Sequence, residues 1–238
     1  MMKRVLIKLS GEALGNPQDG GFNLRAIDQI CTDIANAHHK QYQIGIVIGA
    51  GNVGCRGSVL GAMGIDPVSA DYVGMMATVM NGIVLQSKLQ SMGIGTKICS
   101  SIFINSVSEI YDRYKVIRHM EKGKVVIFTC GTGQPFFTTD TAAVLRAAET
   151  ACDAVLKGTQ VDGVYCSDPK INTGAKRYDS LTYDEAIERE LGVVDKTALF
   201  LAAKQRMPIV VFNIHIGGNL LDVLENKGKF SIISSKMS

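Results

Sequence analysis

The sequence predicts an α/β protein in which a mostly parallel sheet lies between layers of helices. Two observations carry this prediction. Short β-branched runs alternate with longer segments whose apolar residues recur at helical spacing, and no internal repeat or low-complexity tract interrupts the alternation. With 238 residues, of which 46% are hydrophobic and 20% charged, the chain can bury a full core as one domain or as two small lobes.

The predicted elements follow one another in a βαβ rhythm. Parallel strands that are buried on both faces read as short apolar runs, which are found at residues 3–9, 43–49, 124–129, 154–157 and 208–213. Apolar residues at helical spacing fall at residues 24–38, 67–92, 140–151, 183–191 and 193–205. Two stretches rich in Gly, Pro, Asn and Asp, residues 15–21 and 167–176, are expected to be mobile surface loops rather than linkers.

The first strand begins almost at the N-terminus. The start MMKRVLIKLSGEALG has a basic pair and an apolar run, but the run ends at Lys8, too early for a secretory signal, so we expect a strand there. No apolar stretch is expected to reach the length of a membrane span. We therefore expect a soluble, cytoplasmic protein with no membrane partner.

Charge and cysteine content exclude several classes of protein. The net charge is +3, and lysines and arginines are scattered, which does not indicate a nucleic-acid partner. The six cysteines lie far apart, with no CxxC pair, which argues against a zinc site and against a disulfide scaffold. The balance leaves room for an enzyme that binds a small anionic ligand.

A glycine-rich segment follows the third predicted strand and reads GTGQPFFTTD at residues 131–140. Gly131 and Gly133 let backbone N–H groups approach an anion, and Phe136 and Phe137 offer faces for a base. Residues 138–140 have the side chains that cap a helix. The segment is suited to a flat, phosphorylated ligand.

The first predicted strand delivers Lys8, Ser10 and Gly11 at its end. A lysine in that place can reach a transferring phosphoryl group and offset its developing charge. The alternative is an ordinary edge-strand lysine, which the local sequence alone favours.

The second strand runs into Gly49-Ala50-Gly51-Asn52-Val53-Gly54, which matches G-x-G-x-x-G. A dinucleotide fold would need a helix opening at once and an acid at the end of a second strand, and the nearest acids flank the next helix instead. These glycines can equally cradle one phosphate, with Arg56 as a charged fork, or form a flexible turn beside a solvated arginine. No P-loop motif occurs in the sequence.

A third turn reads KGTQVDGVYCSDP at residues 157–169. Tyr165 could flank an adenine, and Asp168 could accept from ribose hydroxyls. The alternative is a hairpin in which Asp162 and Gly163 make the tight turn, Tyr165 is core and Asp168 only punctuates a loop.

In their order and spacing these segments resemble the bacterial uridylate kinases of the amino acid kinase superfamily. The resemblance rests on KLSG at Lys8, the glycine loop with Arg56, the PFFTTD and VDGVY segments, and ADYVGMMATVMNG at residues 70–82, and it spans nearly the whole chain. It implies a single domain over residues 1–238 with a three-layer αβα sandwich.

The resemblance also implies an activity. This is ATP-dependent phosphorylation of UMP to UDP, with Mg²⁺, in pyrimidine nucleotide synthesis by a cytoplasmic homohexamer activated by GTP and inhibited by UTP. No nucleic acid takes part. UMP would bind to residues 1–150, and ATP to residues 151–238 together with the Lys8 loop.

Matching positions give the site residues that the resemblance implies. ATP would contact Lys8, Leu9, Ser10, Gly11, Gly51, Arg56, Thr159, Tyr165 and Asp168. UMP would contact Ala50, Asp71, Thr132, Gly133, Gln134, Pro135, Phe136, Phe137, Thr138 and Thr139, with Asp71 on the ribose and the phenylalanines closing the uracil pocket.

Catalysis would then be in-line placement of the two nucleotides, with Lys8 and the metal spreading charge over the transferring group. Asp140 and Asp195 match acidic positions that orient Lys8 or a metal-bound water. The alternatives are that Asp140 only caps a helix and that Asp195 is only the acidic first turn of the next one.

The chain departs from the family pattern at three places. Ala50 replaces the central glycine of the second loop, which also carries one extra residue before Arg56, and Ala50 must keep a negative φ or shift the ligand. Gln134 stands at a usual asparagine and Gly158 at a usual alanine. We expect catalysis to survive and affinities to differ.

Two other classes of function fit parts of the sequence. One is a kinase-fold sensor or store that binds nucleotide without transferring phosphate. The presence of Lys8, Arg56, Asp71 and Asp168 argues against it, because a protein that only binds nucleotide would not need both nucleotide sites. The other is a dinucleotide oxidoreductase, which lacks a visible ribose-binding acid and a hydride-transfer site.

Overall fold

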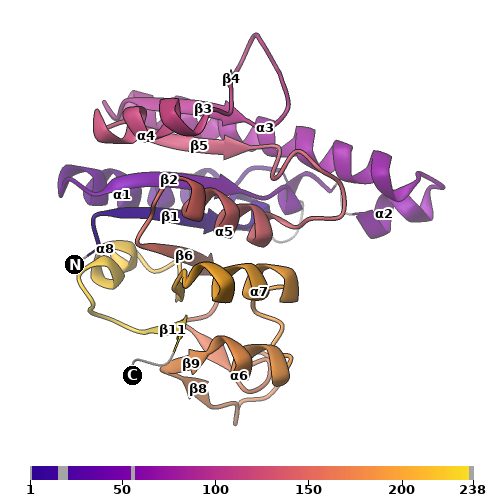
Figure 1. Cartoon of the computed structure of the whole chain (residues 1–238), viewed down its shortest axis with the longest axis vertical. Helices are drawn as coiled ribbons and strands as arrows, with labels where there is room; N and C mark the ends of the chain where they lie inside the picture. Colours follow the sequence, from indigo (N-terminus) through magenta and orange to yellow (C-terminus); the bar gives the residue numbers. More distant parts are fainter. Residues whose placement is uncertain (1, 16–20, 55–56, 236–238) are drawn as a thin grey trace.

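The computed structural model describes residues 2–15, 21–54 and 57–235 of the chain. In this part, nine strands form one sheet in the order β4-β3-β5-β2-β1-β6-β10-β11-β9 (Figure 1). Neighbours pair in parallel except β10 and β11, so β11 and β9 run against the rest. The strands are β1 (Arg4–Leu9), β2 (Gln43–Ile48), β3 (Thr96–Ser100), β4 (Glu109–Ile110), β5 (Val125–Thr129), β6 (Ala154–Thr159), β9 (Ser180–Thr182), β10 (Ile209–Asn213) and β11 (Phe230–Ser234).

Helices cover both faces of this sheet. Figure 1 shows α4, α5 and α7 in front of the strands and α1 and α3 behind them. Two hydrophobic clusters, one on each face, fill the spaces between sheet and helices. The prediction of a three-layer αβα sandwich with a mostly parallel sheet is confirmed. The helices are α1 (Leu24–His39), α2 (Gly57–Ala62), α3 (Pro67–Ser91), α4 (Arg113–Glu121), α5 (Thr139–Glu149), α6 (Tyr183–Glu188), α7 (Lys196–Gln205) and α8 (Asn219–Leu224).

The central strand β1 shows how the sequence pattern distributes side chains between the two layers. Val5, Ile7 and Leu9 belong to the cluster under α1 and α3, whereas Leu6 belongs to the cluster under α5 and α7. Since side chains alternate along a strand, Lys8 faces the α5 and α7 side. β1 lies between β2 and β6, so Lys8 is 8% exposed in the middle of the sheet, and the edge-strand interpretation is wrong.

Polar side chains start the helices where the sequence changes from strand to helix periodicity. Asn23, Asp66, Asp112, Thr138 and Asp195 each accept a hydrogen bond from a backbone N–H of the following first turn. These caps satisfy donors that would otherwise have no intrahelical partner. Thr138 therefore caps α5, and Asp140 lies inside its first turn rather than at the cap.

All five predicted strands and all five predicted helices are present, with differences at their ends. α6 stops at Glu188 and α7 begins at Lys196, and residues 189–193 of the segment between them line a pocket described below. The prediction lacked β3, β4, β9, β11, α2, α4 and α8, which are short or polar, and a two-stranded ribbon described below. The five described cysteines are free thiols, and Cys55 lies outside the described residues.

Helix α3 corrects one expectation from the sequence. With 25 residues and a mean hydropathy of 1.3 over its best window, it is long and apolar enough to cross a membrane, the one such helix among the described residues. Of that window, 44% is buried inside the protein, where Leu85 and Leu89 pack on the sheet. A core helix of a soluble protein passes the same test, so length and composition decide nothing here.

Beyond the main sheet, β7 (Val164–Tyr165) and β8 (Arg177–Tyr178) form an antiparallel ribbon. The turn of this hairpin is the exposed segment 167–176, which confirms the predicted surface loop there. Asp162 and Gly163 precede β7, so the interpretation of these two residues as the tight turn of a hairpin is wrong. Tyr165 is half-buried and not part of the core.

Candidate nucleotide site

The central strand β1 is the point at which the strand order reverses. From β1, the chain adds β2, β3 and β5 toward one edge of the sheet and then β6 and β10 toward the other. In open α/β sheets, the crevice outside the carboxyl ends of the strands at such a switch point is where ligands bind. Lys8, Ser10 and Gly11 lie at this point.

The loops after β1 and β2 pack backbone against backbone. A Cβ on Gly11 would lie 2.3 Å from the N of Gly51 and 2.6 Å from the carbonyl carbon of Ala50. Gly49 donates its N–H to the Leu9 carbonyl over 2.9 Å. Only glycine fits at position 11, and Leu9, whose side chain is in the core, can serve a ligand only through its backbone.

Two buried asparagines brace the second loop from α3. The side chains of Asn52 and Asn81 exchange hydrogen bonds of 3.0 and 2.8 Å, and Asn81 also donates to the Gly49 carbonyl over 2.7 Å. Both are buried, and a buried amide is stable only when its donors and acceptors are paired. Neither asparagine was among the predicted site residues, because nothing in the local sequence shows that the two side chains meet.

The second loop does not continue into a helix at once. A 3₁₀ turn at Gly51–Val53 is followed by Gly54 at φ 73°. Ala50 has φ −118°, so the Cβ that replaces a usual glycine is accommodated at negative φ, as expected. Arg56 lies outside the described residues.

The acceptor loop, residues 130–138, follows β5 in an unusual conformation. Cys130, Gly131, Gly133 and Phe136 have φ values of 60°, 54°, 81° and 70°. For Cys130 and Phe136 this left-handed conformation is strained and persists only where the surroundings hold it. The Cys130 N–H donates to the Thr78 hydroxyl over 2.8 Å, and the Phe136 N–H donates to the Asp71 carboxylate over 2.7 Å. Helix α3 thus holds both ends of the loop.

A hollow of about 160 Å³, the acceptor hollow, lies between this loop, α3 and the second glycine loop. Five of the residues predicted to contact UMP line it: Ala50, Asp71, Thr132, Phe137 and Thr139. The other five, Gly133, Gln134, Pro135, Phe136 and Thr138, do not. Phe136 is 74% exposed and contributes its backbone N–H, and Gln134 exchanges hydrogen bonds with Thr132 through its backbone. The structure adds Gly49, Gly74, Met75, Thr78 and Gly131 to the lining.

Beside the acceptor hollow, two lysines share one carboxylate. Lys8 on β1 and Lys157 on β6 are register partners, and both face α5. The Lys8 ammonium lies 2.8 Å from Asp140 Oδ1, and Lys157 donates to Asp140 Oδ2 and to the Val193 carbonyl. Because two ammonium groups face one carboxylate, this charge cluster carries one net positive charge when both lysines are protonated.

Burial and charge shift the titration of the charge cluster. Burial alone would raise the pKa of Asp140, but the charges of Lys8 and Lys157 hold that pKa below its ordinary value. Burial lowers the pKa of Lys157, Asp140 opposes this, and Lys8 adds to it. Apolar side chains line the small hollow beside these charges and lower the local dielectric constant, so the charges interact strongly. They are Ala143, Val144, Val155, Val194 and Ile209.

Asp195 does not reach Lys8. It caps α7 through the N–H of Ala198 at 2.9 Å and accepts from the hydroxyls of Thr138 at 2.5 Å and Thr141 at 3.3 Å. Asp195 therefore ties the first turn of α5 to that of α7. Its place as the N-cap, rather than inside the first turn, gives it this second role.

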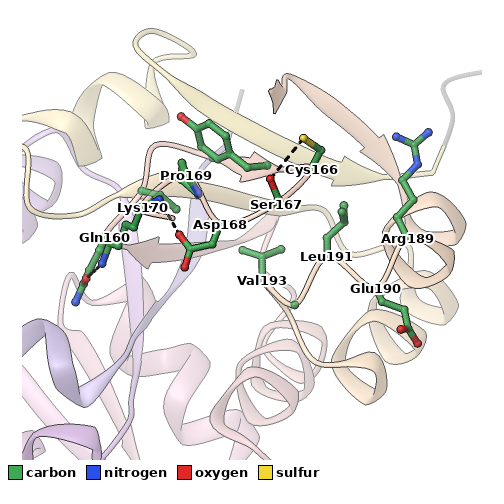
Figure 2. A pocket seen from close by; sticks show the side chains of 14 residues that line it. Gln160, Cys166, Ser167, Asp168, Pro169, Lys170, Arg189, Glu190, Leu191 and Val193 are labelled. Atoms are coloured by element: carbon green, nitrogen blue, oxygen red, sulfur yellow. Dashed lines mark hydrogen bonds between the residues drawn. The ribbon is translucent and has the colours of Figure 1, made fainter. Parts of the chain in front are cut away.

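A larger pocket of about 500 Å³, the donor hollow, lies beyond the charge cluster. Figure 2 shows Gln160, Asp168 and Lys170 on one side of it and Arg189, Glu190 and Val193 on the other. Tyr165 and Asp168, predicted to contact ATP, line this pocket. The wall made by residues 189–193 was absent from the prediction.

The predicted donor residues are held by local turns. Thr159 does not line the pocket. Its hydroxyl accepts a hydrogen bond from the Val161 N–H over 3.1 Å and so stabilises the turn at residues 159–161. The Tyr165 hydroxyl donates to Asp162 over 2.5 Å, and this hydrogen bond, with burial, raises the pKa of Tyr165. Asp168 accepts from the N–H of Lys170 over 2.9 Å.

Contacts connect the two hollows through the charge cluster. Thr139 of the acceptor hollow precedes Asp140, Asp140 meets both lysines, and Lys157 meets Val193 of the donor hollow. Lys157 was not among the predicted site residues. A lysine inside the apolar strand AVLKGT was the signal that could have found it.

Together, the sandwich, its switch-point loops and a cationic cluster between two hollows define a phosphotransferase that holds two ligands around one reaction centre. Residues 3–213 match the family model of the amino acid kinase family. The chain belongs to this family, and within it to the uridylate kinases, as the similarities to individual proteins show.

Curated uridylate kinases resemble the chain along its whole length. The uridylate kinase of Brucella abortus biovar 1 (strain 9-941) is 45% identical over 232 residues, which cover 98% of this chain and 96% of that protein. The one of Wolbachia sp. subsp. Brugia malayi (strain TRS) is 46% identical over 231 residues, 97% and 93% of the two chains.

Solved structures agree. The crystal structure of UMP kinase from Bacillus anthracis has a TM-score of 0.96 and 37% identity, covering 99% of this chain and 97% of that one. UMP kinase from Ureaplasma parvum has a TM-score of 0.93 and 37% identity over 99% and 100% of the two chains.

Proposed function

We propose that this chain transfers the γ-phosphoryl group of ATP to UMP, giving ADP and UDP, in pyrimidine nucleotide synthesis. The observation that carries the proposal is the charge cluster of Lys8, Asp140 and Lys157, which contacts a residue of each hollow. A transferring phosphoryl group is anionic, and a buried cluster with a net positive charge is suited to receive it.

ATP occupies the donor hollow in this proposal. Tyr165 and Asp168 contact the adenosine part, and the wall at residues 189–193 encloses it. The phosphates lie toward Lys8, Ser10, Gly11 and Gly51, at the switch point where the loops after β1 and β2 meet. Arg56 and Thr159 stay on the ATP side as predicted, Thr159 through the turn that it shapes.

UMP occupies the acceptor hollow. Asp71 receives the ribose, Thr132 and Phe137 enclose the uracil, and Ala50 and Thr139 lie toward the phosphate. Gly133, Gln134, Pro135, Phe136 and Thr138 act indirectly, since they set the path of the loop rather than line the hollow.

The chemistry needs placement and charge rather than a general base. A phosphate monoester is largely ionised at neutral pH, so the UMP oxygen attacks without losing a proton to the protein. Lys8 stabilises the charge that spreads over the transferring group, and Asp140 holds the Lys8 ammonium in place. Asp195 positions the start of α5, on which Asp140 lies.

The protein side chains fit Mg²⁺ that enters with ATP. Among residues 2–15, 21–54 and 57–235, no group of three His, Cys, Asp or Glu side chains could hold a metal ion, and both Asp140 oxygens face lysines. Mg²⁺ commonly keeps several waters and binds through substrate phosphates. A metal ion that entered with ATP would add positive charge at the phosphates, beside the ammonium groups of Lys8 and Lys157.

A homohexamer in the cytoplasm, activated by GTP and inhibited by UTP, completes the proposal. An exposed apolar stripe on α3, formed by Tyr72, Met76, Met80 and Ile83, supports association with a second copy, since Met80 is 50% exposed. Light scattering with and without GTP tests the assembly. Met80→Glu, which puts a charge on the stripe, is expected to reduce the oligomer.

The activity is tested by ADP release from Mg²⁺-ATP with UMP, CMP, dUMP or AMP. We expect strong preference for UMP, and a reaction without acceptor gives the ATPase background. Release with none of the four above background would contradict the kinase proposal and favour a nucleotide sensor or store.

A further inference from the structure

A polar relay that begins at a buried arginine lies behind the acceptor loop. Ser101 directly follows β3, and its hydroxyl donates to the Gly131 carbonyl over 2.7 Å. The same hydroxyl accepts from Arg146 Nη2 of α5 over 2.9 Å. Ser101 therefore passes a hydrogen bond from a cation to the backbone of the loop that lines the acceptor hollow.

Arg146 is an unusual residue for this position because it is only 5% exposed. Its other terminal nitrogen donates to Glu149 over 2.6 Å, and its guanidinium carbon lies 3.8 Å from the centre of the Tyr111 ring. Tyr111 also donates its hydroxyl to Glu149 over 2.6 Å. A buried cation is retained at a cost unless it is paired and hydrogen-bonded, and these contacts fix its orientation toward Ser101.

The relay reaches the part of the loop that has left-handed backbone conformation. Gly131 and Gly133 have positive φ, and a Cβ on Gly133 would lie 3.1 Å from the Ser101 Cβ. Gly133 therefore packs directly against Ser101. The Arg146 cation polarises the Ser101 hydroxyl, and this strengthens the hydrogen bond that the hydroxyl donates to the Gly131 carbonyl. The stronger bond holds Gly131, and with it Thr132, in one place.

We propose that Ser101 and Arg146 are positioning residues that set the affinity for the acceptor nucleotide. Neither lines either hollow. They act through the Gly131 carbonyl, which fixes the loop before UMP arrives and so avoids the cost of ordering it on binding. This inference rests on the proposed function, in which the acceptor hollow takes UMP.

The first measurement is the kinetics of Ser101→Ala, which removes one oxygen atom. Loss of a hydrogen bond of this kind is expected to raise the UMP KM about fivefold. kcat and the ATP KM should stay within twofold of the wild type. Ser108→Ala is the matched control, because Ser108 lies on the same β3–β4 connection and donates to Ile104 instead.

A double-mutant cycle tests the relay itself. Arg146→Met is expected to raise the UMP KM at least as much as Ser101→Ala, Arg146→Lys less, and the double variant no more than Arg146→Met alone. Should Arg146→Met not fold, Ser101→Ala and Arg146→Lys give the same comparison.

A rise of threefold or more in the UMP KM of Ser101→Ala, without an equal rise for ATP, supports the proposal. A smaller rise, or equal rises for both nucleotides, overturns it. Absence of UMP-dependent ADP release in the wild type would instead contradict the proposed function.

Discussion

The acceptor hollow and the donor hollow lie at the same end of one sheet but are built differently. The acceptor loop has four residues at positive φ and is held from behind by buried or half-buried groups, among them Thr78 and Ser101. The donor hollow is three times larger and is bounded by exposed segments whose hydrogen bonds are mostly local, such as Tyr165 to Asp162. A loop held by tertiary contacts is pre-organised, whereas local turns leave more freedom.

The difference suggests where selectivity resides. We expect the pre-organised acceptor hollow to discriminate between bases, because a wrong base could not reshape it without breaking hydrogen bonds that hold the loop. The open donor hollow should tolerate a change of base in the phosphoryl donor more readily. The charge cluster belongs to neither hollow, so it should govern rate rather than affinity.

The largest effect is expected for Lys8→Ala. Loss of the ammonium that stabilises the transferring group should lower kcat about 10³-fold. UMP affinity, measured by calorimetry, should stay within about threefold because Lys8 does not line the acceptor hollow. Equal losses of rate and affinity would assign Lys8 to substrate binding and break the separation of roles.

The next effect is expected for Lys157→Met. This substitution removes one of the two cations that contact Asp140, together with the hydrogen bond to the Val193 carbonyl. The Lys8 ammonium is then less well positioned, and kcat should fall about 10²-fold. Lys204→Met, an exposed lysine on α7, is the control. A kcat within threefold of the wild type would show that Lys157 is only structural.

The same variant should change the pH profile of kcat. In the wild type, Lys8 and Lys157 depress the pKa of Asp140 against burial, so Asp140 stays ionised until the pH falls through that lowered value. Asp195 adds a negative charge that acts on Lys157. Removing Lys157 raises the pKa of Asp140, and the acid limb of the profile should move to higher pH. An unmoved limb would argue against a role for ionised Asp140.

A smaller effect is expected for Asp71→Asn. The carboxylate accepts from the Phe136 N–H and lines the acceptor hollow, so its loss removes a charge-assisted hydrogen bond and should raise the UMP KM about tenfold. The ATP KM should not change. Asp184→Asn, an exposed acid on α6, is the control. A matching rise in the ATP KM would mean that the two hollows are not independent.

The smallest effect is expected for Tyr165→Phe. The ring stays, only the hydrogen bond to Asp162 is lost, and the ATP KM should rise less than about threefold. Steady-state kinetics with varied ATP measure it. A rise as large as that of the UMP KM in Asp71→Asn would show that the donor hollow is held as firmly as the acceptor hollow.

Much of the fold could be predicted from local pattern. The apolar runs at β1, β2 and β5, the regular helical spacing in α1 and the length and apolar content of α3 are enough for these elements to be recognised. β3, β11 and α4 could not be, because short or polar segments take their structure from the neighbours against which they pack. Strand order was beyond local pattern for the same reason, and with it the central place of Lys8.

The sequence by itself determined the fold class, the family, and which loops gather at the carboxyl ends of the central strands, because periodicity, glycine-rich turns and short motifs are local properties of the chain. Only the tertiary structure decided that Lys8 is central, that Lys157 shares Asp140 with it, that Asp195 joins two helices, and that Arg146 supports the acceptor loop. These contacts join residues 17 to 132 positions apart in pairs such as Lys157 with Asp140 and Lys8 with Asp140. They depend on strand register and helix placement, which no local pattern encodes.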